Sequence, residues 1–250
     1  MKYRDLTLIS WDEETYLVVT CDSSGGIGDK QRDSVPVSPR ILGFHTAQVA
    51  LLEMLSVGVS PLALCNTLSV EMHPSGEEIL KGIHDALSLL ENGDQVEVTG
   101  STEENIAVSQ TGLGITVMGK ARKKDFLFPE TSEGDQAVVI GMPLMGGCVL
   151  EAKPSELFGL KTLQKLQGKD YIHEVIPAGS QGIIQEIRLL EKRTGLVFLE
   201  AESNPVDLHA SSGPATSALI TLDRGAVEKL RKDAEMPVYV VGEFVRNERS

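Results

Sequence analysis

The pattern of apolar positions in the first half of the chain predicts strands around one long helix. Residues 39–57 are apolar on most faces, which predicts a buried helix with Ser38 as its N-cap, Pro39 at its first position and Gly58 at its exit. Ser75 and Glu78 form a capping-box pattern that predicts a second helix over about 76–91. Short runs rich in β-branched residues predict strands at 6–9, 16–21, 62–70, 95–99 and about 112–119.

The second half repeats this mixture of strands and helices. Strands are predicted at 137–141, 196–200, 217–222 and 237–241, and helices near 154–167, 180–193 and 224–234. The polar stretch between Lys120 and Asp135 predicts a linker, so we expect two domains, 1–124 and 125–250. Alternating strands and helices in both halves indicate an α+β fold of the α/β type.

Composition excludes several classes of function. The chain has 36 acidic and 23 basic residues, a net charge of −13, and such a field repels a phosphate backbone. Aromatic residues make up only 4%, which disfavours a stacking platform for single-stranded nucleic acid. We therefore expect no nucleic-acid partner. No apolar run approaches the roughly 18 residues of a membrane span, and the N-terminus has no signal-peptide core, so we also expect no membrane partner.

The cysteines are Cys21, Cys65 and Cys148, an odd number without a CxxC pair. Neither a disulfide framework nor a zinc site is expected from them, and a reducing cytoplasm is the expected location.

The glycine-rich stretch Asp22–Lys30 is the first candidate for chemistry. It reads as a loop after a strand, and it combines a carboxylate, three glycines and a lysine, which are the groups that a phosphate site needs. It matches neither GxxxxGK[ST] nor GxGxxG. An ordinary glycine-rich turn with solvated charges is the alternative.

Two further segments carry carboxylates. Glu53 lies in the apolar helix, where a buried charge needs a partner cation, a metal or an exposed position. The segment Thr99–Asn105 follows a strand and offers hydroxyl, carboxylate and amide oxygens of the kind that Mg²⁺ prefers. A turn or helix cap is the alternative for this segment.

Two small-residue segments lie in the second half. Gly179–Gly182 opens a predicted helix and is either an anion site or a simple cap. Asp207–Pro214 precedes the strand at 217–222 and reads as a turn that could line a pocket.

Taken in order, these segments resemble the AIR-synthase-related superfamily, which includes AIR synthase, thiamine-monophosphate kinase, selenophosphate synthetase and the hydrogenase-maturation dehydratase. The resemblance covers nearly the whole chain. It rests on LVVTCDSSGGIGDK, ILGFHTAQVALLEMLSVGVSPLAL, VTGSTEEN, IPAGSQGIIQEI, DLHASSGPATSALITL and MPVYVVGEFV. Within the superfamily, the glycine loop, the TGSTEEN turn and the short chain resemble the alpha-ribazole kinase branch, which acts in cobamide (vitamin B12) salvage.

The resemblance implies an AIR-synthase-like fold of two domains. The N-terminal mixed sheet with helices would bind ATP and pair in a homodimer, and the C-terminal α/β sandwich would bind substrate. It implies Mg²⁺ on Asp22, Glu53 and Glu103 or Glu104, with Asp22 and Glu53 as the catalytic pair. ATP phosphates would meet Gly25, Gly26, Gly28, Lys30, Gly100, Ser101 and Thr102, and the acceptor would meet Asn105, Gly179, Ser180 and Gln181.

The implied activity is phosphorylation of a small nucleoside-like alcohol by ATP, with alpha-ribazole as the expected acceptor. A thiamine-monophosphate kinase, an AIR-synthase-like ATP-dependent enzyme and a non-catalytic nucleotide-binding module are the alternatives.

Overall fold

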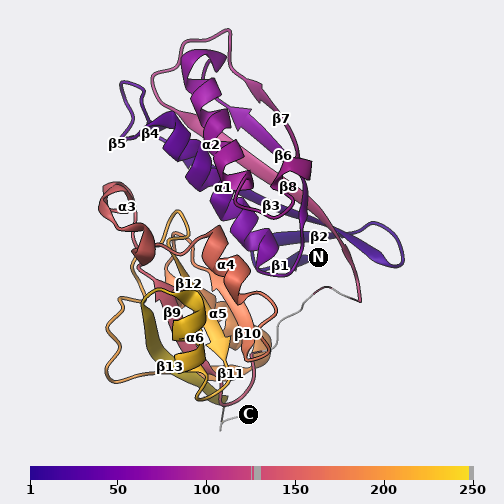
Figure 1. Cartoon of the computed structure of the whole chain (residues 1–250), viewed down its shortest axis with the longest axis vertical. Coiled ribbons are helices and arrows are strands. Elements are labelled where there is room, and N and C mark those ends of the chain that lie inside the picture. The colour runs from indigo at the N-terminus through magenta and orange to yellow at the C-terminus, as the bar shows by residue number, and fades with distance from the viewer. Residues whose placement is uncertain (125, 127–130, 248–250) are drawn as a thin grey trace. The chain divides into compact units, whose positions relative to one another are not determined.

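The structure is a computed structural model that describes residues 1–124, 126 and 131–247. The chain divides into two compact units, Met1–Phe126 and Leu127–Ser250. Figure 1 shows both units, each with a sheet and helices. Much of the stretch 120–135 expected as a linker lies outside the described residues.

Within the described residues, the first unit is built on a six-stranded mixed sheet. Its only parallel pair is β6 with β7, and the other neighbours are antiparallel. The strand order is β1 (Lys2–Tyr3), β2 (Leu6–Ser10), β3 (Thr15–Gly25), β8 (Gly112–Arg122), β6 (Pro61–Leu68) and β7 (Glu97–Thr102). The strands β4 (Ile27–Gly28) and β5 (Val35–Pro36) form a separate, two-stranded parallel sheet, and both lie between β3 and α1 in the sequence.

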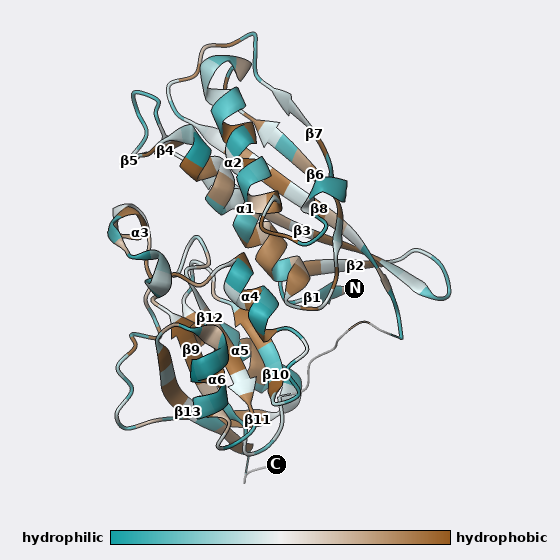
Figure 2. Cartoon of the chain, in the orientation of Figure 1, coloured by the Kyte–Doolittle hydropathy of each residue, from teal (hydrophilic) through white to brown (hydrophobic). Residues whose placement is uncertain are grey.

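Two helices cover one face of this sheet (Figure 1). They are α1 (Pro39–Leu55) and α2 (Glu77–Leu87), which approach closely because Gly43 and Gly82 have no side chains at their contact. A Cβ at Gly82 would clash with the carbonyl oxygen of Arg40. Figure 2 colours much of α1 as hydrophobic, as expected of a helix buried on most sides. The opposite face of the sheet carries residues that are half-buried or exposed.

Short helical turns complete the first unit. The π-helical turn η1 (Met72–Gly76) leads into α2, and the 3₁₀ turn η2 (Gly93–Gln95) precedes β7.

The second unit is built on a five-stranded antiparallel sheet among the described residues. The strand order is β10 (Ile172–Pro177), β12 (Ser217–Leu222), β9 (Gln136–Gly141), β13 (Val238–Arg246) and β11 (Leu196–Glu200). The helical elements are α3 (Gly147–Glu151), η3 (Pro154–Glu156), α4 (Leu160–Leu166), α5 (Ile183–Thr194) and α6 (Val227–Ala234).

Both faces of this second sheet are buried. Ile183, Ile187 and Leu190 of α5 pack on one face in a cluster with Val139 and Phe244. Strand residues on the other face of the sheet, such as Val138, Ile140 and Ile220, are also fully buried. A sheet buried on both sides needs helices on both sides, and α4 and α6 pack against each other in the same unit.

The structure corrects several predicted boundaries. Asp22–Gly25 is not loop, because β3 continues through Gly25 in register with β8. The expected helix at 154–167 is a 3₁₀ turn followed by the shorter α4, and α2 ends at Leu87. Ser38 makes no side-chain cap, and the capping box at Ser75 does not form because the Ser75 hydroxyl contacts Asp29 and Glu71 instead.

Among the described residues, none of the helices combines the length and apolar character needed to cross a bilayer.

Candidate functional site

The strands β3, β6 and β7 run in the same direction and end at one edge of the first sheet, where the segments 26–34, 69–76 and 103–111 meet. Gly26 N donates to Thr111 O at 2.9 Å, and Glu103 N donates to Leu68 O at 3.0 Å. Met72 N donates to a Glu104 carboxylate oxygen at 2.8 Å. These bonds join segments that are far apart in sequence, so the predicted glycine loop and the predicted Thr99–Asn105 turn share one edge of the sheet.

The glycines of the first loop adopt conformations that favour glycine. Gly26 has φ +69° and Gly28 has φ +150°. A Cβ at Gly28 would clash with Thr111 and Asp33, whereas one at Gly25 would meet nothing within 4 Å. The backbone at Gly25 is therefore open to approach, while Gly28 is required for the fold of the loop.

Lys30 does not project freely from this loop. Its ammonium group is hydrogen-bonded to the carboxylate of Glu71, and its backbone N–H donates to Asp33 at 2.8 Å. The sequence predicted a phosphate contact for Lys30 and gave no sign of its partner Glu71.

Gly100, Ser101 and Thr102 belong to the end of β7. A side chain at Gly100 would clash with Asn66, so this glycine lets β7 pass close to β6. Thr102 donates to Glu104 at 3.0 Å, and Ser101 is exposed. Any role of these three residues in nucleotide binding stays a prediction.

Glu103 and Glu104 both accept hydrogen bonds from nearby backbone. Glu103 caps its own loop, because its Oε1 accepts the N–H groups of Asn105 at 2.7 Å and Ile106 at 3.1 Å. Glu104 caps the start of η1 through Met72. Such hydrogen bonds from a carboxylate to nearby backbone N–H groups are typical of a turn, which is the alternative interpretation of the Thr99–Asn105 segment. Asn105, in the same loop, is exposed.

Asp22 has a different environment. It lies on the face of β3 that α1 covers, between Thr20, which donates to Ala50 O at 2.8 Å, and Ser24, which lies 2.9 Å from the Thr46 hydroxyl. Burial raises the pKa of Asp22 to about 6, and only the Ser23 backbone N–H opposes that shift. Within the described part of the chain, no cation compensates this carboxylate.

Glu53 lies in the last turn of α1 and has a cation as its partner. Arg4 Nη2 donates to Glu53 Oε2 at 3.3 Å and to Ser56 Oγ at 3.2 Å. Burial raises the pKa of Glu53 to about 7; Arg4 opposes the shift, and the charges of Asp5 and Asp22 add to it. Asp22 and Glu53 are therefore close enough to interact electrostatically.

The four predicted metal ligands do not form one cluster. The contacts of Thr20 with Ala50 and Ser24 with Thr46 show that α1 runs antiparallel to β3. Glu53 therefore lies toward the start of β3, whereas Glu103 and Glu104 lie at the far end of the sheet. The described residues contain no group of three or more His, Cys, Asp or Glu side chains placed to hold a metal ion.

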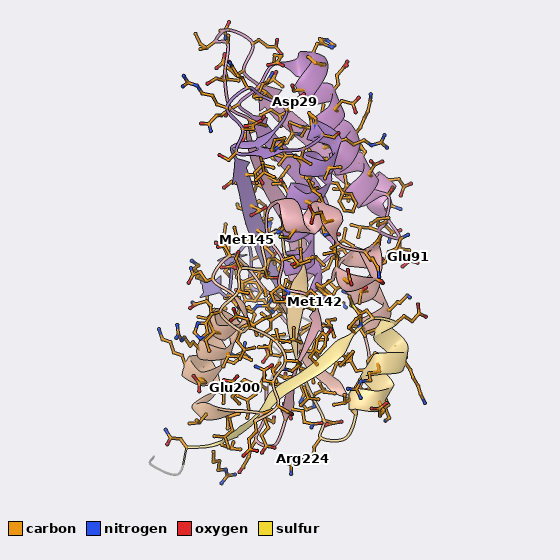
Figure 3. All side chains as sticks on the ribbon, turned by 90° about the vertical axis from the view of Figure 1, so that its left-hand side faces the viewer. Asp29, Glu91, Met142, Met145, Glu200 and Arg224 are labelled. Carbon is orange, nitrogen blue, oxygen red and sulfur yellow. The ribbon has the colours of Figure 1, made fainter. Side chains whose placement is uncertain are left out.

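In the second unit, the predicted acceptor residues lie between β10 and α5. Ser180 and Gln181 are exposed, and Gly179 O accepts the N–H of Ser212 at 3.2 Å. The expected turn before β12 thus borders the Gly179–Gly182 segment. Thr216, two residues beyond that turn, donates to Met142 O at 2.8 Å. The segment that contains Met142 and Met145, both labelled in Figure 3, therefore lies next to the same turn.

Sequence reasoning missed Arg4 and Glu71 as partners of the two most prominent candidates. Arg4 is 49 residues from Glu53, and Glu71 is 41 residues from Lys30. No local motif signals either pair, because each forms only when the sheet and α1 have assembled.

The raised pKa of Asp22 predicts a pH-dependent stability. A carboxyl group whose pKa rises from 3.8 to about 6 on folding stabilises the fold fully only below its unfolded pKa, and that contribution is lost as the pH rises toward 6. The unfolding free energy of the wild type should fall between pH 4 and pH 7.5, and we expect Asp22→Asn to make this fall smaller by about 2 kcal/mol. Urea denaturation at several pH values measures it, and an unchanged pH profile would contradict the assignment.

No protein-family model matches the chain, and no curated protein sequence matches it. Solved structures do match. Thiamine-monophosphate kinase from Stenotrophomonas maltophilia K279a superimposes with a TM-score of 0.62 at 16% identity, covering 98% of this chain and 90% of that one. AaThiL complexed with AMPPCP and TMP gives a TM-score of 0.61 at 14% identity, covering 98% and 85%.

A third match is T. maritima PurL complexed with ATP, with a TM-score of 0.67 at 12% identity; it covers 97% of this chain but 42% of PurL. At these identities the likeness establishes the fold. The expected AIR-synthase-like fold of two domains is therefore confirmed, and the activity is not fixed by it.

Proposed function

We propose that the chain is an ATP-dependent kinase of the AIR-synthase-related superfamily. Its phosphoryl acceptor would be a small nucleoside-like alcohol, and we propose alpha-ribazole as that acceptor. The observation that carries the proposal is the half-buried Asp22 carboxylate on the face of β3 that α1 covers, which has no compensating cation among the described residues. A buried charge without a partner costs stability and is typical of a site that binds a cation during function. Structures of the same fold bound to AMPPCP and to ATP support a nucleotide as the ligand.

The residues present fit a magnesium ion that arrives with ATP. Proteins bind Mg²⁺ through one or two carboxylates, and the substrate phosphates and water complete the shell. Asp22 would supply such an oxygen ligand. Glu53 is the second predicted carboxylate, but it would have to leave Arg4 to do so. When bound, Mg²⁺ neutralises charge that develops on the phosphates during transfer.

The chain's own groups would position the reactants. The open backbone at Gly25 and the loop through Lys30 would approach the phosphates, and Gly179, Ser180 and Gln181 of the second unit would contact the acceptor. In-line phosphoryl transfer depends mostly on such positioning and on charge stabilisation, with little covalent chemistry for the protein.

An assay of ADP release tests the activity directly. The full chain is incubated with MgATP and a panel that includes alpha-ribazole, other nucleosides and thiamine monophosphate. We expect turnover with alpha-ribazole. Turnover only with thiamine monophosphate would favour the thiamine-monophosphate kinase alternative, and ATP binding without turnover on any acceptor would favour a non-catalytic nucleotide-binding module.

We also propose that the chain forms a homodimer through the uncovered face of the first sheet. Three cross-strand rows lie on this face, and residues in register share a face. None of the nine residues on β3, β8 and β6 is acidic or basic, although 24% of the chain is charged; the edge strand β7 extends the same rows with Glu97, Thr99 and Ser101, so the uncharged patch is confined to these three strands. They are Val19, Met118 and Ala63, then Cys21, Thr116 and Cys65, then Ser23, Gly114 and Thr67.

An uncharged patch of this kind is typical of an interface core. We expect Thr116→Arg to convert the dimer to a monomer, because the charged arginine would be buried against the second copy of the chain. Light scattering should give twice the 27.0 kDa chain mass for the wild type and for the control Ser88→Arg, an exposed position just after α2, which lies on the opposite face of the sheet. A wild-type mass of 27.0 kDa at all concentrations would contradict the proposal.

A further inference from the structure

The pair formed by Lys30 and Glu71 has properties that a simple surface ion pair lacks. The two side chains are only 18% and 32% exposed. The Ser75 hydroxyl lies 3.1 Å from the Glu71 oxygen that Lys30 contacts and 3.3 Å from a carboxylate oxygen of Asp29. The hydrogen bond from Lys30 is the main reason that the pKa of Glu71 lies below its usual range. Glu71 is therefore held as an anion against this lysine.

The backbone around Lys30 is also fixed. Asp33 accepts the Lys30 N–H at 2.8 Å through one oxygen, and its other oxygen accepts the Thr111 N–H at 2.8 Å. The loop is thus anchored to the start of β8, and the lysine side chain reaches across to the segment after β6. Only its terminal contact with Glu71 is free to exchange for another anion.

The surroundings make that exchange costly for a polyanion. Asp29, which Figure 3 labels, shares Ser75 with Glu71, and Glu104 contacts the neighbouring Met72. His73 lies 3.1 Å from Glu77 and is 76% exposed. The loop 26–34 carries two cations, Lys30 and the exposed Arg32, and Glu71 cancels the charge of Lys30. A phosphate chain at Lys30 would therefore face the Glu71 carboxylate at close range.

We propose that Glu71 is a built-in counter-ion of an oligophosphate site, which occupies Lys30 until a phosphate chain displaces it. The inference takes its ligand class from the proposed function, since Lys30 is the cation expected to meet the ATP phosphates. Its physical consequence is that Glu71 weakens anion binding. This distinguishes a displaceable counter-ion from a residue that positions Lys30 for its ligand, because removing a positioning residue would weaken binding instead.

Glu71→Gln separates charge from hydrogen bonding. The amide keeps an oxygen acceptor for Lys30 and Ser75 but removes the negative charge. Because the pair is partly exposed and screened by water, we expect binding to tighten by about fivefold. Calorimetry on the full chain measures binding of sodium tripolyphosphate and, separately, of ATP. The matched control is Glu78→Gln, which removes the same charge from an exposed pair with Lys81 on α2.

A second comparison isolates the lysine. Adding Lys30→Met to Glu71→Gln should abolish the gain, and the gain should shrink at high salt. Tripolyphosphate binding that is no tighter in Glu71→Gln than in the wild type and the Glu78→Gln control would overturn the inference, and so would a gain that survives without Lys30. If Glu71→Gln tightens tripolyphosphate binding while ATP binds to no variant, the counter-ion is supported and the proposed kinase function fails.

Discussion

Asp22→Asn should slow phosphoryl transfer severely without loss of stability at pH 8. The carboxylate is half-buried beside α1, and this desolvation raises its pKa to about 6, so at pH 8 its ionisation costs the folded protein free energy. Asparagine removes that cost. If the charge serves to hold Mg²⁺ on the ATP phosphates, its loss withdraws transition-state stabilisation, and kcat should fall by about 10²–10³.

The measurement pairs urea denaturation with the rate of alpha-ribazole phosphate formation at pH 8. Asp94→Asn is the matched control, since Asp94 is an exposed aspartate in the same unit, and both its stability and its rate should equal those of the wild type. Parallel loss of stability and activity in Asp22→Asn would mean that the carboxylate supports the fold rather than the reaction.

Arg4→Met should destabilise the first unit by about 3–5 kcal/mol at pH 8. The side chains of Arg4 and Glu53 are only 5% and 11% exposed, so the substitution would leave the Glu53 carboxylate buried without its cation. Arg4 itself adopts φ +53°, an unusual conformation for a residue other than glycine, and it sits between β1 and β2. The ion pair thus ties the start of the first sheet to the end of α1.

The double variant Arg4→Met with Glu53→Leu should recover most of this loss, because an apolar pair of similar volume replaces the ion pair. Urea denaturation of the single and double variants measures the effect. Equal stability of Arg4→Met and the wild type would show that the pair contributes nothing. Failure of the double variant to recover would show that Arg4 supports the fold in some other way.

Glu53→Gln then separates the two interpretations of this residue. A catalytic Glu53 predicts a fall in kcat in a protein that melts normally. A structural Glu53, held by Arg4, predicts a change in stability with activity altered only through the folded fraction.

The sequence predicts elements best where the signal is local. The helix α1 was predicted over 39–57 and spans Pro39–Leu55, because its apolar run is bounded by Pro39 and Gly58. The segment Asp22–Gly25 was predicted as loop from its polar and glycine residues. Pairing with β8, some 90 residues later, extends it as a strand, and no local pattern encodes that partner.

The candidate site divides in the same way. Asp22 and Glu53 stand out in the sequence because a carboxylate among apolar residues is conspicuous wherever it lies. Their environments could not be predicted, since Arg4 reaches Glu53 through tertiary structure while Asp22 receives no such partner among the described residues. Ser75 illustrates a local rule overridden by tertiary contacts: its capping-box pattern is intact, but Glu71 and Asp29 engage its hydroxyl.

Calorimetric titration of the full chain with ATP, with and without Mg²⁺, tests the central claim most directly. We expect binding that depends on Mg²⁺ in the wild type and is lost or severely weakened in Asp22→Asn, because that carboxylate would hold the metal against the phosphates. Equal affinity for ATP in Mg²⁺ and in EDTA, or unchanged MgATP binding in Asp22→Asn, would contradict the account.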